Sequence, residues 1–156
     1  MSSMVAELKT RHVFDLSIRV ARPIEIGDFG YGARRVIPIT GGELRGDNMS
    51  GTILAGGADY QIIRPNGFTE LEAKYAIELS DGEKIYIENL GVRFGPKEAL
   101  ERIRAGEAVP PELIYFRSVP RFETGSEKYR WLMEHIFIGS GARHPDRVEL
   151  AVFQVL

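Results

Sequence analysis

Hydrophobic and polar positions alternate along most of the chain, a pattern typical of strands that bury one face. The first clear run covers residues 14–20 and the last covers residues 148–152. Between Pro38 and Gly57, paired glycines interrupt this pattern, as they do at the bends of closed sheets. Many short strands with glycine turns are typical of an antiparallel barrel or sandwich. We favour an antiparallel β-barrel of about eight or more strands, because closure leaves no exposed edge.

Two turn sequences, Pro65-Asn66-Gly67 and Ser80-Asp81-Gly82, indicate how the central strands pair. A glycine at the last loop position fits the left-handed bulge that completes a three-residue hairpin. The resulting register opposes Asp59 to Ala73, and it aligns two pairs of opposite charge: Glu78 with Lys84 and Lys74 with Glu88. A slip of one residue would separate these pairs and turn every side chain of a strand to its other face.

The same register defines one face of the hairpins, and most of its side chains are apolar: Ala73, Tyr75, Ile77, Leu79, Ile85 and Ile87. Three polar side chains share this face: Asp59, Gln61 and Asn89. A buried polar group without a partner costs ~1–3 kcal/mol, and a charge costs more. Two interpretations remain open. These three polar residues form either a binding site or a structural network, in which Asp59 would accept backbone N–H bonds near Gly56-Gly57.

Helical signals occur at two places. Pro96 in a first turn and Gly106 after a last turn predict a helix of about ten residues, whose apolar side is Ala99, Leu100 and Ile103. A second helix is expected to begin at Thr124, where Glu127 completes a capping box. A strand should follow, and we expect Gly139-Ser140-Gly141 to form a turn after it.

Composition narrows the class of protein. A chain of 156 residues with 44% hydrophobic content can bury one core, and we predict a tail at residues 1–11 and a barrel domain at residues 12–156. No run approaches the ~18 apolar residues of a membrane span, and the lack of cysteine suits a reducing cytoplasm. The net charge of −2 argues against a nucleic-acid partner.

Neither a metal site nor a cofactor is predicted. His12, His135 and His144 are the only histidines, and their spacing matches no metal motif.

The segment from Tyr115 to Gly125 is dense in aromatic and charged residues. If Tyr115 and Arg117 face inward, a guanidinium enters the same cavity and can hold a carboxylate or enolate oxygen with paired donors. If Ile114 and Phe116 face inward instead, Arg117 lies on the surface. The alternation leaves both orientations open.

Several short motifs occur in order between residues 14 and 155: Gly56-Gly57-Ala58-Asp59-Tyr60-Gln61, Tyr75, Asp81-Gly82 with Ile85-Tyr86, Tyr115-Phe116-Arg117, Phe122-Glu123-Thr124-Gly125, Tyr129-x-Trp131-Leu132 and Phe137-Ile138-Gly139. Together they resemble the bacterial and fungal family called domain of unknown function 3237, or uncharacterised protein family 0311. The resemblance implies a compact β-barrel with a short helix and no settled activity. It also implies recurrent polar positions at Asp59, Tyr75, Arg117 and Glu123. Where many relatives carry Trp, Asn and His, this chain has Tyr60, Glu134 and Phe94.

These observations predict a barrel cavity that binds a small anionic or enolisable molecule. The predicted catalytic residues are Asp59 and Tyr75. The predicted ligand-binding residues are Gln61, Asn89, Tyr115, Arg117, Glu123 and Trp131. In a dry cavity burial would raise the pKa of Asp59 and suit it to a general acid, whereas Arg117 within ~4–6 Å would keep it ionised as a general base.

Cofactor-independent isomerase or lyase chemistry is the enzymatic interpretation of this cavity. A carrier with the same pocket and no chemistry is a second interpretation. A third is an assembly module, a homo-oligomer in which the outward Tyr60, Ile62 and Tyr86 form a subunit interface.

Overall fold

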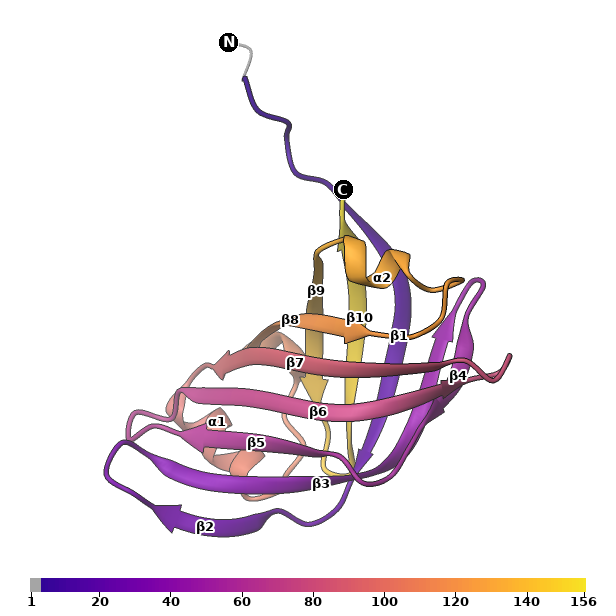
Figure 1. The fold of residues 1–156 in the computed structure, drawn as a ribbon. Helices are drawn as coiled ribbons and strands as arrows, with labels where there is room; N and C mark the ends of the chain where they lie inside the picture. Colours follow the sequence, from indigo (N-terminus) through magenta and orange to yellow (C-terminus); the bar gives the residue numbers. More distant parts are fainter. Residues whose placement is uncertain (1–3) are drawn as a thin grey trace.

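The chain folds into a closed antiparallel β-barrel in a computed structural model that describes residues 4–156 (Figure 1). The strands are β1 (Thr10–Val20), β2 (Ile24–Asp28), β3 (Ala33–Gly46), β4 (Ser50–Ile53), β5 (Ala58–Ile63), β6 (Thr69–Leu79), β7 (Lys84–Phe94), β8 (Tyr115–Glu123), β9 (Phe137–Arg143) and β10 (Arg147–Val155). The helices are α1 (Lys97–Arg104), α2 (Trp131–Glu134) and a 3-10 turn at Pro111–Leu113. Strand β1 thus begins inside the tail that we predicted for residues 1–11.

Pairing runs around the wall in the order β1-β10-β9-β8-β7-β6, and β3 closes the barrel by pairing with β1. Strands β4 and β5 share one place in the wall, because each pairs with β3 on one side and β6 on the other. The wall therefore has eight positions, which confirms the predicted fold class. Strand β2 is an additional strand that pairs with β3.

The predicted hairpin register is confirmed. Asp59 pairs with Ala73 between β5 and β6. The two predicted pairs of opposite charge also occur between β6 and β7: Glu78 with Lys84 and Lys74 with Glu88. Both turn glycines adopt the left-handed conformation that the bulge requires, with φ of +90° at Gly67 and +89° at Gly82.

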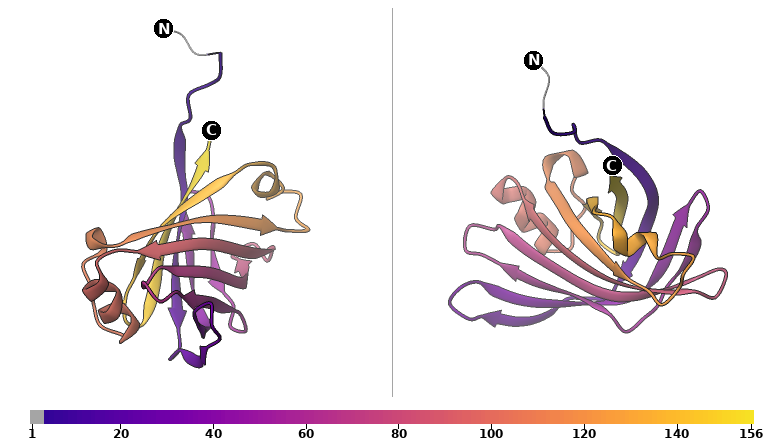
Figure 2. Two further views of the ribbon diagram at one scale, coloured as in Figure 1. Left: turned by 90° about the vertical axis from the view of Figure 1, so that its left-hand side faces the viewer. Right: turned by 45° about the horizontal axis from the view of Figure 1, so that its top comes forward.

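An apolar core fills the part of the barrel next to α2. Phe122 lies between Phe14 and Phe137, with ring centroids 5.7 and 5.2 Å apart and edge-to-face geometry. Leu132 of α2 is fully buried against this cluster. Helices α1 and α2 lie in different parts of the molecule (Figure 2), so the end of the barrel near α1 lies away from this apolar core.

The first helix is confirmed as α1, which follows Pro96 and buries the three predicted apolar residues: Ala99, Leu100 and Ile103. Gly106 follows it with φ of +82°, as the helix end requires. The second helix begins later than predicted, at Trp131. The Thr124 hydroxyl does accept the Ser126 N–H, but it also donates to the Lys84 carbonyl and so belongs to a turn held against β7.

The turn predicted at Gly139-Ser140-Gly141 is wrong, because these residues lie within β9. Glycine is needed there for space inside the barrel. A Cβ on Gly141 would lie 2.8 Å from the ring of Phe116, and a Cβ on Gly139 would collide with the Ser118 hydroxyl. The two glycines therefore admit inward side chains from β8.

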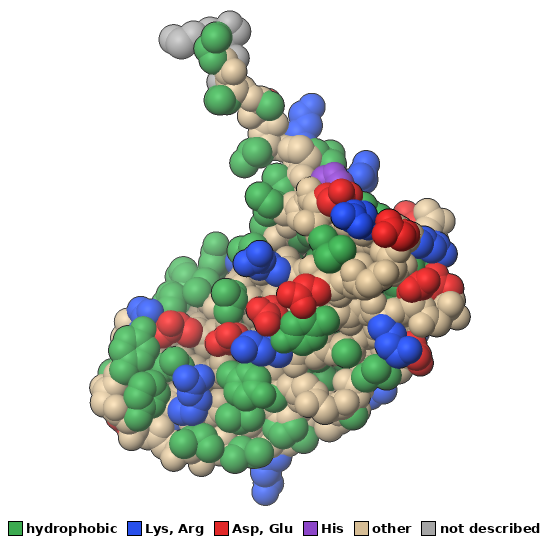
Figure 3. Space-filling view, in the orientation of Figure 1, with side chains coloured by type: hydrophobic (Ala, Val, Ile, Leu, Met, Phe, Trp, Pro, Cys, Tyr) green, Lys and Arg blue, Asp and Glu red, His purple; other side chains and the backbone are tan. Residues whose placement is uncertain are grey.

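The outer wall is chemically mixed. In the view of Figure 3, hydrophobic, basic and acidic side chains intermingle over the strands. Within residues 4–156, no helix has the length and apolar character that crossing a membrane requires.

Candidate functional site

A cavity of about 40 Å³ lies inside the barrel. Its polar lining consists of Asp59, Gln61, Asn89, Arg93, Ser118 and Arg143. The remaining lining is mostly aliphatic and aromatic, including Ile37, Leu71 and Phe116. Because one water needs ~10–15 Å³ of such space, the cavity accommodates about three water-sized groups.

Strand alternation brings the polar residues together from four strands. Asp59 and Gln61 are successive inward positions of β5. Asn89 and Arg93 are inward on β7 with Gly91 between them. Ser118 lies opposite Gly91 on the neighbouring strand β8. Three of the predicted residues therefore do share this cavity: Asp59, Gln61 and Asn89.

Asp59 is held in place by two hydrogen bonds. Gln61 Nε2 donates to Asp59 Oδ2 over 2.8 Å, and the Glu72 backbone N–H donates to Oδ1 over 3.2 Å. Burial raises the pKa of Asp59, and the Gln61 hydrogen bond and the charge of Arg93 oppose that rise only in part. The carboxyl group therefore retains its proton to a higher pH than an ordinary aspartate does.

Arg93 supplies the positive charge that we had expected from Arg117. Its side chain is only 4% exposed, and its guanidinium carbon lies 5.7 Å from the centroid of the Phe116 ring. Burial lowers the pKa of Arg93 to about 10, although the Asp59 charge opposes this. Arg93 therefore remains a cation at neutral pH.

Two further arginines add positive charge around the cavity. Arg143 lines it directly, and its Nη1 donates to the His144 carbonyl over 2.6 Å, which anchors the side chain to the β9–β10 turn. Arg35 on β3 is buried beside Gln61. Its Nε lies 3.0 Å from Glu25 Oε1 at the surface. Burial lowers the pKa of both arginines, Arg35 and Arg143.

Several polar atoms of the site have no hydrogen-bond partner among residues 4–156: Gln61 Oε1, Asn89 Oδ1, Arg93 Nε and Ser118 Oγ. Buried polar atoms are normally paired, so each unpaired one calls for an explanation. Here the unpaired atoms combine donors and acceptors on one cavity. The site can therefore offer hydrogen bonds to a small polar molecule.

Tyr75 lies deeper in the barrel, on the same face as Asp59. It is 2% exposed and packs within the apolar core, so it does not line the cavity itself. Burial and, secondarily, the Asp59 charge raise the pKa of Tyr75, which keeps the phenol protonated. A glycine is needed opposite the tyrosine, because a Cβ on Gly57 would lie 2.6 Å from the Cβ of Tyr75.

The structure does not bring Tyr115 or Arg117 to the cavity. Strand β8 turns Phe116 inward and these two residues outward, which is the second of the two orientations left open by the sequence. Arg117 stacks over the Tyr115 ring at 5.2 Å and donates to the Phe116 carbonyl. The inward position suits Phe116 because Gly141 leaves room for its ring.

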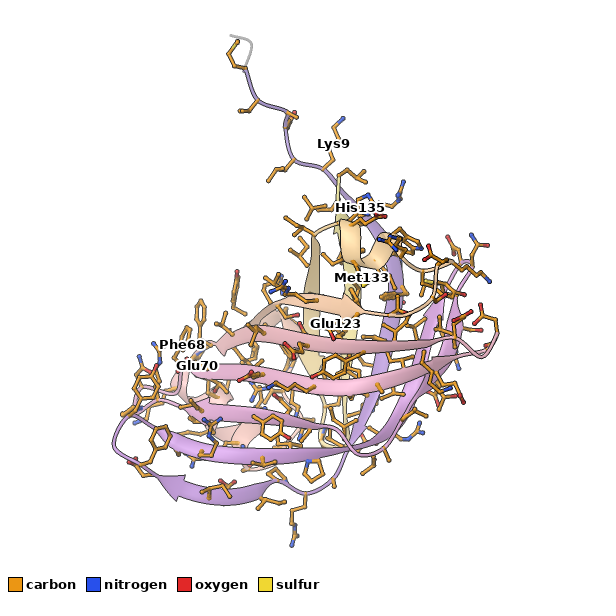
Figure 4. All side chains as sticks on the ribbon, in the orientation of Figure 1. Lys9, Phe68, Glu70, Glu123, Met133 and His135 are labelled. Atoms are coloured by element: carbon orange, nitrogen blue, oxygen red, sulfur yellow. The ribbon has the colours of Figure 1, made fainter. Side chains whose placement is uncertain are left out.

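Glu123 and Trp131 also lie away from the cavity. Glu123 is exposed at the end of β8 (Figure 4). Trp131 belongs to α2 and contacts Phe137, with ring centroids 5.9 Å apart, at the apolar end of the barrel. A sequence signal did exist for Arg93, since extending the alternation from Asn89 by two further inward positions reaches it.

The site is rich in cations and poor in metal ligands. In the described part of the chain, no three His, Asp or Glu side chains gather closely enough to hold a metal ion. The cavity has one carboxylate and two guanidinium groups. This donor set is suited to an anionic organic group.

Known proteins similar to this chain share both its sequence and its fold. A protein of the family UPF0311 from Rhodopseudomonas palustris is 55% identical over 153 residues, which cover 98% of this chain and 100% of that protein. The crystal structure of a conserved protein of unknown function from Rhodopseudomonas palustris has a TM-score of 0.95 at 53% identity, covering 97% of this chain and all of that one. A β-barrel-like protein from Acinetobacter baumannii has a TM-score of 0.87 at 32% identity, covering 99% and 100% of the two chains.

The family model described as "Protein of unknown function (DUF3237)" matches residues 8–155. This range includes every strand of the barrel, and it agrees with the resemblance found in the sequence motifs. The chain belongs to the DUF3237 family, also named UPF0311.

Proposed function

We propose that the barrel cavity binds a small organic acid and that Asp59 transfers a proton next to its carbonyl group. The observation that carries this proposal is the position of Asp59, a carboxyl of raised pKa, in one cavity with Arg93 and Arg143. The chemistry needs no cofactor. It corresponds to an isomerase or lyase acting on an enolisable acid.

Charge supports an anionic ligand. Two guanidinium groups, those of Arg93 and Arg143, line the cavity against one carboxyl group. The charge of the nearby Arg35 is already balanced by Glu25. Planar guanidinium groups bind carboxylate and enolate oxygens with paired donors. A ligand with a negative charge would balance this excess, which a neutral ligand would leave uncompensated.

The proton transfer can be written with the residues of the site. Asp59 in its carboxylate form takes the proton from the carbon beside the carbonyl, and the C–H electron pair moves onto the carbonyl oxygen. Arg93 or Arg143 stabilises the enolate oxygen that forms. The protonated Asp59 then returns the proton to carbon. A raised pKa favours this cycle, because a general base works best when its pKa lies near the working pH.

The other polar residues have supporting roles in this proposal. Gln61 positions the Asp59 carboxylate through its 2.8 Å hydrogen bond. Asn89 and Ser118 offer unpaired atoms to the ligand. Tyr75 remains a protonated phenol in the apolar core and does not contact the ligand directly.

Exchange of α-protons in D₂O tests the proposal without knowledge of the natural substrate. The probes are pyruvate, 2-oxobutyrate and levulinate, and proton NMR follows the loss of their α-proton signals. We expect the wild-type protein to accelerate exchange of at least one probe and Asp59→Asn to abolish that acceleration. Arg45→Gln is the control, because Arg45 is exposed on β3 and outside the cavity.

Two outcomes would overturn the enzymatic proposal. The first is equal exchange rates for wild type and Asp59→Asn with a probe that the wild type accelerates. The second is tight binding of a probe in the cavity with no acceleration of exchange. That second result would instead favour a carrier that releases its ligand unchanged.

A second candidate function is an assembly module, favoured by apolar side chains that are exposed on the outer wall: Leu90, Phe94, Tyr115 and Val119. The rings of Phe94 and Tyr115 stack with centroids 4.8 Å apart. In the interface that we predicted from the sequence, Tyr60 is exposed but Ile62 and Tyr86 are partly buried. Light scattering of the wild type and Tyr115→Ser tests this function, and a monomer at every concentration would contradict it.

A further inference from the structure

A second groove opens outside the barrel, between the β5–β6 turn and α1. Its volume is about 380 Å³, much larger than that of the inner cavity. The charged residues that line it are Arg64, Arg93, Lys97, Glu101 and Arg104. Phe68 and Glu70, labelled in Figure 4, mark this end of the barrel. Four positive charges therefore share the groove with one negative charge.

Arg93 lies between the groove and the inner cavity, because it lines both. Its side chain is 4% exposed, and its Nε has no hydrogen-bond partner among the described residues. The guanidinium therefore stands between the two spaces with a free donor. Arg93 is therefore placed to contact a ligand group on either side of it.

The cations of the groove differ in how fully they are paired. Arg64 is engaged by Glu70, with Nε 3.1 Å from Oε2. Lys97 has a long contact of 3.9 Å with Glu101. Arg104 forms no ion pair with any of residues 4–156, and its charge acts with burial to lower the pKa of Arg35. Arg104 is therefore the most available cation at the mouth of the groove.

We propose that the ligand has two anionic groups, one held in the inner cavity and the other held by Arg104 and Lys97 in the groove beside α1. This inference rests on the proposed function and specifies its substrate class. The ligand is an elongated acid whose second group is a carboxylate or a phosphate. Both groups are recognised by the same guanidinium and ammonium chemistry.

Size supports a second subsite outside the inner cavity. The inner cavity accommodates only about three water-sized groups, which is the size of one carboxylate or enolate group. The rest of any larger substrate must therefore extend outward. The groove on the other side of Arg93 has the volume and the charge to receive it.

A series of acids of increasing length tests the proposal. The probes are the monoacids acetate, propionate and butyrate and the diacids malonate, succinate, glutarate and adipate. Calorimetry measures their affinities. The salt concentration is about 0.15 M, so that distant charges are screened and direct contacts dominate. We expect one diacid to bind about tenfold more tightly than the monoacid of similar length, which corresponds to one additional charge-assisted contact.

Single substitutions separate the two subsites. Arg104→Gln should remove most of the diacid advantage and leave monoacid affinity unchanged. Arg143→Gln should weaken monoacids and diacids alike, because Arg143 lines the inner cavity. Arg45→Gln makes the same change of charge on an exposed arginine of β3, outside the groove, and should change neither.

The outcomes distinguish this inference from the proposed function. If monoacids bind in an Arg143-dependent way and no diacid binds more tightly, the second subsite is wrong and the inner acid site stands. If Arg104→Gln leaves the diacid advantage intact, the assignment of the groove is wrong. If no acid binds and no probe exchanges its α-protons, the proposed function fails together with the inference.

Discussion

Asp59 and Arg93 line one cavity, yet no ion pair joins them within residues 4–156. Asp59 instead accepts hydrogen bonds from Gln61 and from the Glu72 backbone. Arg93 lowers the pKa of Asp59 through its charge alone and keeps its Nε unpaired. The positive charge therefore remains available to a ligand, although it also stabilises the carboxylate.

The charge of Arg93 predicts how the pKa of Asp59 responds when Arg93 or Arg117 is replaced. Arg93→Gln should raise the pKa of Asp59, because it removes a positive charge that lowers that pKa in the wild type. Arg117→Gln should leave the pKa unchanged, since Arg117 faces outward. Carbon-13 NMR of the Asp59 carboxyl group measures both. If Arg117→Gln shifted the pKa of Asp59 more than Arg93→Gln does, Arg117 would face the cavity, contrary to the structure.

Asp59 should also lower the stability of the folded protein at neutral pH. Because its pKa is raised above 3.8 on folding, the folded state binds more protons than the unfolded state at pH values between the two pKa values. Stability contributed by the protonated form is therefore complete below about pH 4 and is lost as the pH rises through the raised pKa. Asp59→Asn cannot ionise and avoids this loss.

We therefore expect Asp59→Asn to have a higher Tm than the wild type at neutral pH, with a difference that shrinks toward about pH 4. The amide can keep the Glu72 hydrogen bond, and a flipped Gln61 can present its unpaired Oε1 to the new N–H₂ group. Thermal unfolding across this pH range measures the difference. A variant that is less stable at neutral pH would show that the ionised carboxylate stabilises the barrel.

The hairpins were predictable from the sequence because their turns carry local information. Gly67 and Gly82 occupy left-handed positions that few other residues adopt. Once both turns are placed, the strand period of two fixes that Asp59 and Asn89 face inward. The carboxylate at the centre of the site was therefore predictable from residues close in sequence.

The orientation of β8 could not be found in the same way, because apolar residues occupy both of its faces. Phe116 and Phe122 point inward, while Tyr115 and Val119 point outward. The choice depends on Gly141, a residue of the neighbouring strand that leaves space for the Phe116 ring. Such a contact is visible only once the strands are paired.

Gly57 should be among the least replaceable residues of the barrel. A Cβ at this position would collide with the Lys74 carbonyl and lie 2.6 Å from the Cβ of Tyr75, so backbone would have to move. We expect Gly57→Ala to reduce the free energy of unfolding by about 1–3 kcal/mol, as overpacking does. Urea unfolding measures this. Gly125→Ala is the matched control, because a Cβ on Gly125 would meet nothing within 4 Å, and it should change stability by less than about 0.5 kcal/mol.

Asp81 should make the barrel sensitive to acid. Hydrogen bonds from Lys128, then Tyr129 and the Glu83 backbone lower the pKa of Asp81 to about 2. The Tyr129 hydroxyl lies 2.6 Å from Asp81 Oδ2. Because the folded pKa lies below the ordinary 3.8, this group stabilises the fold above about pH 4, and the contribution disappears as the pH falls toward 2.

Tyr129→Phe removes one of these hydrogen bonds and should therefore lower the Tm at neutral pH by more than it does near pH 2, where Asp81 is losing its charge. Thermal unfolding of both proteins as a function of pH measures the difference. Tyr60→Phe provides the control, because the Tyr60 side chain is exposed on the outer wall and its change in Tm should not vary with pH. A Tyr129→Phe deficit of the same size at every pH would mean that the tyrosine acts through packing against the core, where its ring is buried.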